Sequence, residues 1–376
     1  MNNVKALKGF GQSIWLDYIR RDLLIDGSLR RLVEEDGLSG VTSNPSIFQK
    51  AITESNFYTS TIASSANDRS LPVEPLYEIL AIEDVRQAAD ILLPVFESTK
   101  GRDGYVSLEV SPQLARDTRG TIEAARRLWG SVDRPNLMIK IPATQEGLPA
   151  FEEVLADGIN VNVTLLFSLQ RYEQVALHYI NALERRHAVG LGVKHCASVA
   201  SFFLSRIDTA VDRLIEARLS TKTRPDERRL LEGLRGHAAV ASARLAYQHW
   251  KRLFSGTRWE ALAAAGAKTQ RLLWASTSTK NPAYDDLLYV ESLIGPDTVN
   301  TLPPATLDAL RDHGQARPAI EKQVDEAADT LKTLQQLGID MGRITDKLLE
   351  EGLEQFDMAY KKLLVAIETE RRRLVA

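Results

Sequence analysis

The chain of 376 residues has a single cysteine, Cys196. One thiol cannot form an intramolecular disulfide, and it is too few for a cysteine-rich zinc site. No stretch approaches the roughly 18 consecutive apolar residues of a membrane-spanning helix. The N-terminal segment MNNVKALKGFGQSIW also lacks the continuous apolar core of a signal peptide. These absences predict a cytoplasmic protein without a membrane segment.

The sequence also lacks a large excess of charge of either sign. Lys and Arg number 47 and Asp and Glu number 50, which gives a formal net charge of −3. A general nucleic-acid binder needs a clustered basic excess, and the sequence has none. The six histidines show no metal-ligand spacing such as HExxH. We therefore expect no nucleic-acid partner and no metal.

Short apolar runs alternate with helical periodicity along the whole chain, for example helices over 168–184, 206–217 and 237–254. The runs are mostly apolar and do not alternate cleanly, which is typical of parallel strands covered on both faces. The predicted strands are 13–18, 40–43, 105–110, 137–141, 160–167, 196–203, 272–276 and 298–302. Eight strands alternating with helices predict a closed (β/α)₈ TIM barrel that forms one domain over 1–376. A doubly wound open sheet is the alternative, but no Gly-rich phosphate loop follows the first strand.

Three segments are longer than the barrel requires. Residues 45–104 contain a helical pattern at 74–97, residues 207–271 hold two or three helices, and 304–376 form a helical extension. The last helix, 350–373, has apolar residues at helical spacing, so we expect it to pack on the barrel. A lid or a subunit contact is the alternative. The sequence leaves a monomer and a homodimer equally open.

Polar residues stand in or just after strands that are otherwise apolar. In a TIM barrel, such positions at the carboxyl ends of strands form the catalytic face. One of them would mean little, but seven of the eight predicted strands supply at least one. They are Asp17, Asn44, Glu109, Lys140, Asn162, Thr164, Ser201 and Ser276.

Lys140 is the most specific catalytic candidate among these residues because it stands within the apolar run LMIKI. Desolvation of a lysine disfavours the ammonium form, and the free amine is the nucleophile of Schiff-base chemistry on carbonyl substrates. A structural lysine is the alternative. Asp17 and Glu109 are candidate proton carriers beside it, or else carboxylates that only form an ion pair with Lys140.

A candidate anion site lies further along the chain. Arg206 begins the helix after the sixth strand, and Ser276 and Lys280 follow the seventh. Helix starts and the late loops of a barrel both favour phosphate. A surface role for Arg206 is the alternative. Asn44 precedes Pro45, which marks a turn, and asparagine in such a turn is often only a local backbone hydrogen-bonding partner.

Three motifs together resemble the transaldolase family over essentially the whole chain. They are GVTSNPSIF at 40–48, LMIKIPATQEGLPAFEEV at 137–154 and GINVNVTLLFS at 158–168. The length and the long inserts are similar to the longer bacterial type. The resemblance implies a class I enzyme of the pentose phosphate pathway, without metal or cofactor. It would move a dihydroxyacetone unit between sedoheptulose 7-phosphate and glyceraldehyde 3-phosphate, giving erythrose 4-phosphate and fructose 6-phosphate.

The resemblance also implies residue roles. Lys140 matches the Schiff-base lysine, and Asp17 matches the residue that takes the proton from the C4 hydroxyl. Glu109 and Thr164 match the pair that holds a water for carbinolamine dehydration. The positions that bind substrate are matched by Asn44, Asn162, Ser201, Phe203, Arg206 and Ser276.

The chain departs from the family pattern at the second cationic phosphate ligand. The shorter enzymes carry an arginine two residues after the serine, where this chain has Ser278, and Lys280 is the nearest cation. That exchange replaces a bidentate guanidinium by a point charge. Another class I aldolase, such as one that releases dihydroxyacetone from fructose 6-phosphate, remains an alternative. A non-catalytic binding barrel is a second one, disfavoured because the candidate catalytic residues all occur together.

Overall fold

The structure is a computed structural model that describes residues 2–65, 71–222 and 224–375. Within these ranges eight parallel strands pair in chain order, and β8 pairs back to β1, which closes a barrel. The strands are β1 Gln12–Leu16, β2 Gly40–Val41, β3 Tyr105–Glu109, β4 Leu137–Pro142, β5 Val161–Leu166, β6 Ser198–Phe203, β7 Arg271–Ala275 and β8 Thr298–Leu302. The predicted (β/α)₈ barrel is confirmed, and the open sheet is excluded.

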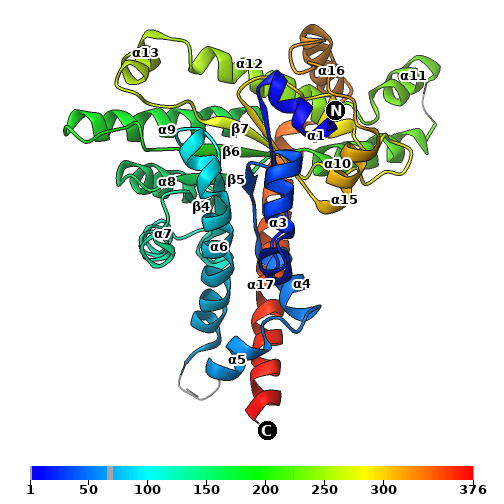
Figure 1. Cartoon of the computed structure of the whole chain (residues 1–376). Coiled ribbons are helices and arrows are strands. Elements are labelled where there is room, and N and C mark those ends of the chain that lie inside the picture. Colours follow the sequence, from blue (N-terminus) through cyan, green and yellow to red (C-terminus); the bar gives the residue numbers. More distant parts are fainter. Residues whose placement is uncertain (1, 66–70, 223, 376) are drawn as a thin grey trace.

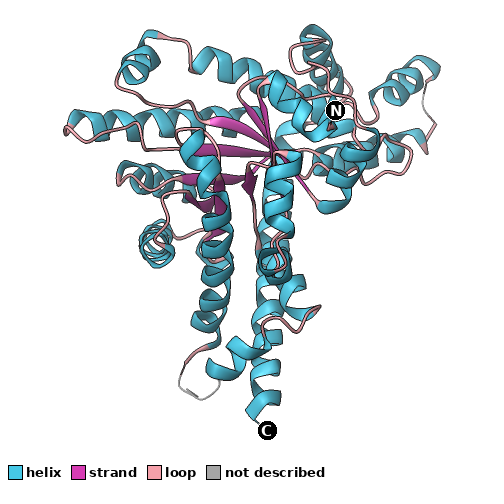
Figure 2. Cartoon of the chain, viewed as in Figure 1, coloured by secondary structure: helices cyan, strands magenta, loops and turns pink. Residues whose placement is uncertain are grey.

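Helices surround the strands on all sides (Figures 1 and 2). The shorter ones are α1 Asn3–Ala6, α2 Arg21–Ile25, α3 Ser28–Arg31, α4 Pro45–Thr53, α5 Thr59–Ser65, α8 Gly147–Ala156, α11 Pro225–Leu234, α13 Thr257–Ala264, α14 Leu288–Glu291 and α15 Pro304–His313. The longer ones are α6 Val73–Ser98, α7 Thr118–Val132, α9 Leu169–Ala188, α10 Ser205–Leu219, α12 Ala238–Leu253, α16 Val324–Gln336 and α17 Met341–Val375. Single-turn helices occur at Leu7–Phe10, Leu32–Asp36 and Pro112–Leu114. None of the helices in the described ranges combines the length and the apolar character needed to cross a membrane.

Each predicted strand overlaps one observed strand, and the differences lie at the ends. The first run, predicted as 13–18, pairs only over Gln12–Leu16, and the second, predicted as 40–43, pairs only at Gly40–Val41. The apolar pattern outlasts the hydrogen-bonded ladder because residues just beyond a strand still pack in the core. Asp17 therefore lies one residue past the end of β1, where its backbone N–H donates to the carbonyl of Leu302.

The long connections contain the expected helices. The insert 45–104 holds α4, α5 and α6, with 66–70 outside the described residues, and 207–271 holds most of α10 together with α11, α12 and α13. The predicted C-terminal helix 350–373 is only part of α17, which begins at Met341. It packs against α4, α5 and α6. In Figure 1, α6 and α17 extend from the barrel in the same direction.

Strand register decides which side chains share a level inside the barrel. In the pairing of β3 with β4, Glu109 stands opposite Lys140, and in the pairing of β4 with β5, Lys140 stands opposite Asn162. Residues paired side by side point to the same face, and so do residues two apart on one strand. The register thus brings an acid, an amine and an amide to one level of the barrel interior.

Candidate active site

The Lys140 side chain lies at the centre of the carboxyl end of the barrel. It is only 4% exposed. Its Nζ donates to the backbone carbonyl of Ser43 at 2.9 Å and lies 3.3 Å from Oε2 of Glu109. A buried ammonium needs such partners because burial removes much of its hydration. The lysine therefore does not extend to solvent, and its amine is held inside the barrel.

Asp17 lies near Lys140 from the other side, beyond the end of β1. Burial raises the pKa of its carboxyl, while the charge of Lys140 and a hydrogen bond from Thr42 act in the opposite direction. The Thr42 hydroxyl donates to Oδ1 of Asp17 at 2.7 Å and also lies 2.7 Å from the hydroxyl of Thr301. A carboxyl with a raised pKa takes up a proton more readily at neutral pH, as a general base must.

Glu109 is the second carboxylate beside the lysine, and its side chain is only 6% exposed. Burial raises the pKa of its carboxyl, Lys140 lowers it, and the negative charge of Asp17 raises it further. Two carboxylates thus share one ammonium in a water-poor site, so removing the charge of either one changes the proton affinity of the others.

The end of β5 is irregular at the point where it enters the site. The register between β5 and β6 shifts between Val163 and Leu166, and Leu165 adopts a left-handed backbone with φ of 59°. Non-glycine residues in this region are strained, and such strain clusters at functional sites. Thr164 lies within this irregular segment, and its hydroxyl has no hydrogen-bond partner among the described residues. It can therefore hold a substrate oxygen or a water.

Two amides take different positions. Asn44 caps α4, because its Oδ1 accepts from the backbone N–H of Ile47 at 3.0 Å, and the same side chain lines the cavity. It is therefore a local backbone hydrogen-bonding partner, as one interpretation of the sequence held, and a lining residue of the cavity as well. Asn162 lies deeper, where it donates to Ser107 at 3.1 Å and accepts from the Ser201 hydroxyl at 2.6 Å. It orients Ser201 and contributes no wall of its own.

The far side of the cavity is cationic. Arg206 begins helix α10 over the Phe203 ring at 5.5 Å, and its Nη1 is buried without a partner among the described residues. Burial lowers the pKa of this guanidinium. Lys280 donates to Ser278 at 2.7 Å, and partial burial lowers its pKa, helped by the nearby charges of Arg206 and Lys50. Cations that repel one another here are stabilised by a bound dianion.

The hydroxyl of Ser276 completes this end of the site. It lies 2.8 Å from the hydroxyl of Ser205, and Ser276 itself has a left-handed backbone with φ of 55°. The pair links the turn after β7 to the start of α10, which carries Arg206. The contact therefore holds the turn that carries Ser276 and the helix that carries Arg206 in a fixed relation.

Helix α17 forms one wall of the same cavity. Phe356 lines it, and Gly352, one turn earlier, packs directly on two site elements. A Cβ at Gly352 would lie 3.0 Å from Cδ2 of Leu165 and 3.4 Å from Nη1 of Arg206. The absence of a side chain is what lets this helix approach the guanidinium. The C-terminal helix therefore packs on the barrel, as expected, and also shapes the site.

Nine of the eleven predicted site residues line one cavity of about 150 Å³. The nine are Asp17, Asn44, Lys140, Thr164, Ser201, Phe203, Arg206, Ser276 and Lys280. Glu109 and Asn162 lie behind its wall, in contact with Lys140 and Ser201. Six further residues that were not predicted as site residues also line the cavity, namely Thr42, Ala275, Ser278, Thr301, Pro303 and Phe356. Thr42, in the run GVTS, follows the same strand-end rule that found the others, whereas nothing local marks Phe356.

In the described part of the chain, no three His, Cys, Asp or Glu side chains come together so as to hold a metal ion. The chemistry available from these residues is that of a buried amine, two carboxylates, hydroxyls and an anion-binding end.

The fold and the site define a (β/α)₈-barrel enzyme built around a buried lysine. A family model described as Transaldolase/Fructose-6-phosphate aldolase matches residues 14–367. A protein named Transaldolase from Thiobacillus denitrificans is 51% identical over 367 residues, covering 98% of this chain and 100% of that protein. Transaldolase 2 of a Nostoc species is 47% identical over 98% of this chain and 97% of its own length. The Transaldolase of Neisseria gonorrhoeae is 45% identical over 98% and 99%. The chain belongs to the transaldolase/fructose-6-phosphate aldolase family.

Proposed function

We propose that this chain acts as a transaldolase, a transferase that moves a dihydroxyacetone unit through a Schiff base on Lys140. The substrates would be phosphosugars of the pentose phosphate pathway. Sedoheptulose 7-phosphate and glyceraldehyde 3-phosphate would give erythrose 4-phosphate and fructose 6-phosphate. The observation that carries the proposal is the Lys140 amine, held 3.3 Å from Glu109 and near Asp17 in a cavity whose far side is cationic. Full-length relatives named Transaldolase support it.

The first step forms the covalent bond. Glu109 takes a proton from the Lys140 ammonium, and the free amine attacks C2 of the ketose. The protonated Glu109 then returns its proton to the carbinolamine hydroxyl, which leaves as water, and an iminium remains. Thr164, whose hydroxyl has no partner among the described residues, can hold that water beside the carboxyl.

Cleavage follows from the charge on the iminium. Asp17 removes the proton from the C4 hydroxyl, the C3–C4 bond breaks, and its electrons neutralise the iminium as an enamine. The aldose phosphate leaves. The iminium is itself the electron sink, so the reaction needs no organic cofactor and no metal.

A transferase must then keep the three-carbon enamine from protonation by water until an acceptor aldehyde arrives. The amide of Asn44 and the hydroxyl of Ser201 face the cavity, where they can bind the two hydroxyls of the dihydroxyacetone unit. Phe203 and Phe356 add apolar walls that limit water. Attack of the enamine on the aldehyde takes back the proton from Asp17, and hydrolysis of the new iminium releases the product.

Arg206, Ser276 and Lys280 would bind the phosphate of donor and acceptor. These contacts are remote from the bond that breaks, so they contribute by orienting the reacting carbons. In the shorter enzymes an arginine stands two residues after the serine. This chain has Ser278 there, so Lys280 would supply the second cation.

We extend the proposal to the architecture and location of the enzyme. The barrel, its inserts and its C-terminal helices would form one domain over 1–376, active as a monomer or a homodimer. Its substrates are water-soluble metabolites, so we propose a cytoplasmic location. No nucleic acid takes part.

The test is an assay with fructose 6-phosphate as donor and erythrose 4-phosphate as acceptor, following glyceraldehyde 3-phosphate formation with a coupled dehydrogenase. Without erythrose 4-phosphate, a transaldolase releases at most one equivalent of glyceraldehyde 3-phosphate per active site, and it turns over continuously only when erythrose 4-phosphate is present. Equal turnover without it, with free dihydroxyacetone released, would identify a fructose 6-phosphate aldolase instead. No turnover in either case would contradict both.

A further inference from the structure

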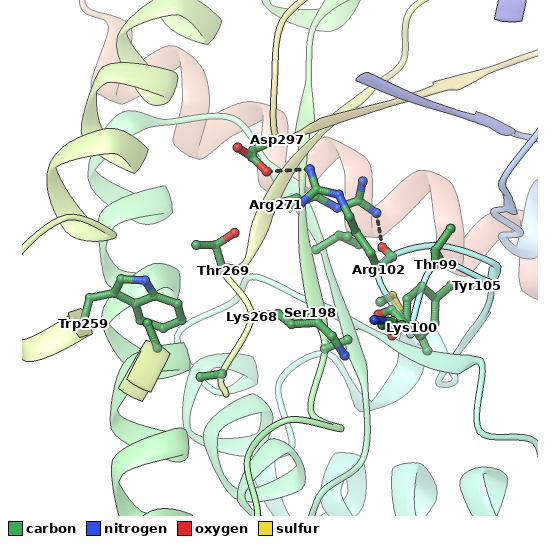
Figure 3. A pocket seen from close by; sticks show the side chains of 16 residues that line it. Thr99, Lys100, Arg102, Tyr105, Ser198, Trp259, Lys268, Thr269, Arg271 and Asp297 are labelled. Carbon is green, nitrogen blue, oxygen red and sulfur yellow. Dashed lines mark hydrogen bonds and ion pairs between the residues drawn. The ribbon is translucent and has the colours of Figure 1, made fainter. Parts of the chain in front are cut away.

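A second cavity lies at the opposite end of the barrel from Lys140. It has a volume of about 450 Å³, against about 150 Å³ for the catalytic cavity. Its walls come from the starts of β3, β4, β6 and β7, the segments before them, and helix α13 (Figure 3). Arg271 at the start of β7 lines this cavity, whereas Ser276 beyond the end of β7 lines the catalytic one. The proposed reaction uses none of its residues.

The lining of this cavity is strongly basic. Four cationic side chains line it, namely Lys100, Arg102, Lys268 and Arg271, together with a single carboxylate, Asp297. The chain as a whole has a net charge of −3, so this concentration of positive charge is local. Cations gathered in a concave site focus the potential and attract anions.

The two arginines are already paired. Arg102 forms an ion pair with Asp297 at 2.6 Å. Arg271 pairs with the buried Asp103 at 3.2 Å and donates to Ser13 at 2.7 Å, so it closes the floor of the barrel. These pairs hold the guanidinium groups in place and leave the two lysines as the unneutralised charges.

The lysines have no carboxylate partner within the described residues. Lys268 donates to the neutral backbone carbonyl of Lys194 at 2.8 Å, and burial lowers the pKa of its ammonium. A Cβ at Gly101 would lie 3.1 Å from this Nζ, so the glycine, with φ of +69°, gives the ammonium room beside the loop. The ammonium group of Lys100 makes no hydrogen bond or ion pair to any described residue. Most of the ammonium donors therefore remain available to a ligand.

An apolar wall stands across from these charges. Trp259 is 5% exposed and is fixed by an edge-to-face contact with Phe254 at 4.8 Å. Its indole N–H makes no hydrogen bond to the described residues. Met138 and Val199 continue the apolar surface toward the barrel floor. Small-molecule sites commonly combine such walls with a few polar groups that fix orientation.

We propose that this cavity is a second ligand site, which binds a phosphate monoester through Lys100, Lys268 and Arg102 and packs the organic part of that ligand on Trp259. A dianionic phosphate matches two unneutralised lysines and one oriented guanidinium. The proposal stands apart from the catalytic function. The enzyme can be a transaldolase whether or not this site is occupied.

The experiment is calorimetric titration of the full-length protein carrying Arg206→Ala, which removes a main phosphate ligand of the catalytic cavity. The probes are AMP, glycerol 3-phosphate and inorganic phosphate. We expect AMP to bind this variant, and Lys268→Met added to it to weaken AMP binding at least tenfold. Lys194→Met, which removes an equal charge just outside the cavity, should leave AMP affinity within twofold. Circular dichroism melting of each variant checks that it is folded.

Two results would overturn the proposal. If no probe binds Arg206→Ala, the cavity is not an anion site. If AMP binds but Lys268→Met changes nothing, the ligand sits elsewhere. If AMP binds more tightly than inorganic phosphate, the result supports contact between the organic part of the ligand and Trp259. Equal affinity for all three probes would show that Trp259 does not contact the ligand. The erythrose-dependent assay measures the catalytic function separately, so a failure of one proposal leaves the other intact.

Discussion

The Nζ of Lys140 lies 3.3 Å from Oε2 of Glu109, with both groups buried at the carboxyl end of the barrel. This ion pair couples the nucleophile to its own proton acceptor. The raised pKa of Glu109 makes the transfer of a proton from the ammonium easier, because the neutral pair costs less to bury than two separate charges. Asp17 adds a second carboxyl with a raised pKa at the same amine. Substitution can remove the amine or either carboxylate separately.

Asp17→Asn should stop cleavage while leaving Schiff-base formation intact. The amide cannot accept the C4 proton, so we expect kcat to fall by about 10²–10⁴-fold, the usual range for loss of a general base. Borohydride treatment of this variant with fructose 6-phosphate should trap the whole six-carbon ketose on the protein, as measured by intact mass. A three-carbon adduct in this variant would show that another group removes the proton.

The wild-type enzyme should lose kcat/KM as the pH falls. Asp17 must be ionised to act as a base, and burial raises its pKa above the ordinary value of 3.8. The acidic limb of the profile should therefore lie above pH 3.8. Because Asp17 and Glu109 interact, the limb reports the pair and neither residue alone. A profile that stays flat down to pH 4 would contradict the role of Asp17.

Lys280→Met should raise KM for erythrose 4-phosphate by about 10–100-fold, the loss expected for one charge-assisted hydrogen bond. The kcat should change little, because the phosphate is remote from the reacting carbons. Adding Ser278→Arg to this variant should recover part of the loss, since residue 278 lines the same cavity. Lys332→Met, far from that cavity, serves as the control. An unchanged KM in Lys280→Met would remove this lysine from the phosphate site.

Gly352→Ala should weaken phosphate binding through a neighbour. The new methyl group would lie 3.0 Å from Leu165 and 3.4 Å from Arg206, so one of them must shift. We expect a higher KM for erythrose 4-phosphate and a stability loss of about 1–3 kcal/mol from overpacking. Gly130→Ala in α7 is the matched control, because no atom lies within 4 Å of the position that its methyl group would take. It should gain about 0.5–1 kcal/mol with no change in KM. Similar behaviour of the two variants would contradict the contact.

Asp208 should make stability depend on pH. Burial raises the pKa of this carboxyl to about 6, although hydrogen bonds from Ala239 and Tyr289 oppose the shift. The folded protein holds the proton at pH values where the unfolded chain has released it, so the stabilising contribution is full below about pH 4 and lost as the pH rises through 6. The rise of the pKa from 3.8 to about 6 corresponds to about 3 kcal/mol.

Urea denaturation measures this effect as a difference. The free energy of unfolding is measured for Asp208→Asn and for wild type at each pH. The value for Asp208→Asn minus the value for wild type should increase by up to about 3 kcal/mol between pH 4 and pH 7, because only the wild type loses this contribution. Asp226→Asn, which changes an exposed side chain on α11, is the control and should show no such growth. A constant difference between Asp208→Asn and wild type would contradict the assigned burial effect.

The sequence predicted the barrel, and it singled out most of the residues that line the candidate cavity, for one physical reason. In a parallel barrel, each strand must be apolar on both faces, so a polar residue near its carboxyl end stands out. Lys140 and Asn162 were visible in this way, and the register then placed them side by side. The same rule would have found Thr42, which lies within the predicted strand 40–43, but only Asn44 was singled out from that segment.

The parts that could not be predicted depend on packing between distant segments. Phe356 and Gly352 come from a helix of 35 residues whose sequence shows only helical periodicity. Their place at the cavity depends on how that helix crosses α4 and the end of β5. The bulge at Leu165 is equally hidden, because nothing in the run NVNVTLLF marks a left-handed residue.

Every step of the proposed reaction depends on the covalent bond to Lys140, and borohydride trapping detects that bond itself. The wild-type protein is incubated with fructose 6-phosphate, reduced, digested and mapped by mass spectrometry. We expect a reduced three-carbon adduct on the peptide that carries Lys140, its loss when erythrose 4-phosphate is added before the borohydride, and no adduct in Lys140→Met. Folded wild-type protein that acquires no adduct, or acquires one on a different lysine, would contradict the Schiff-base mechanism.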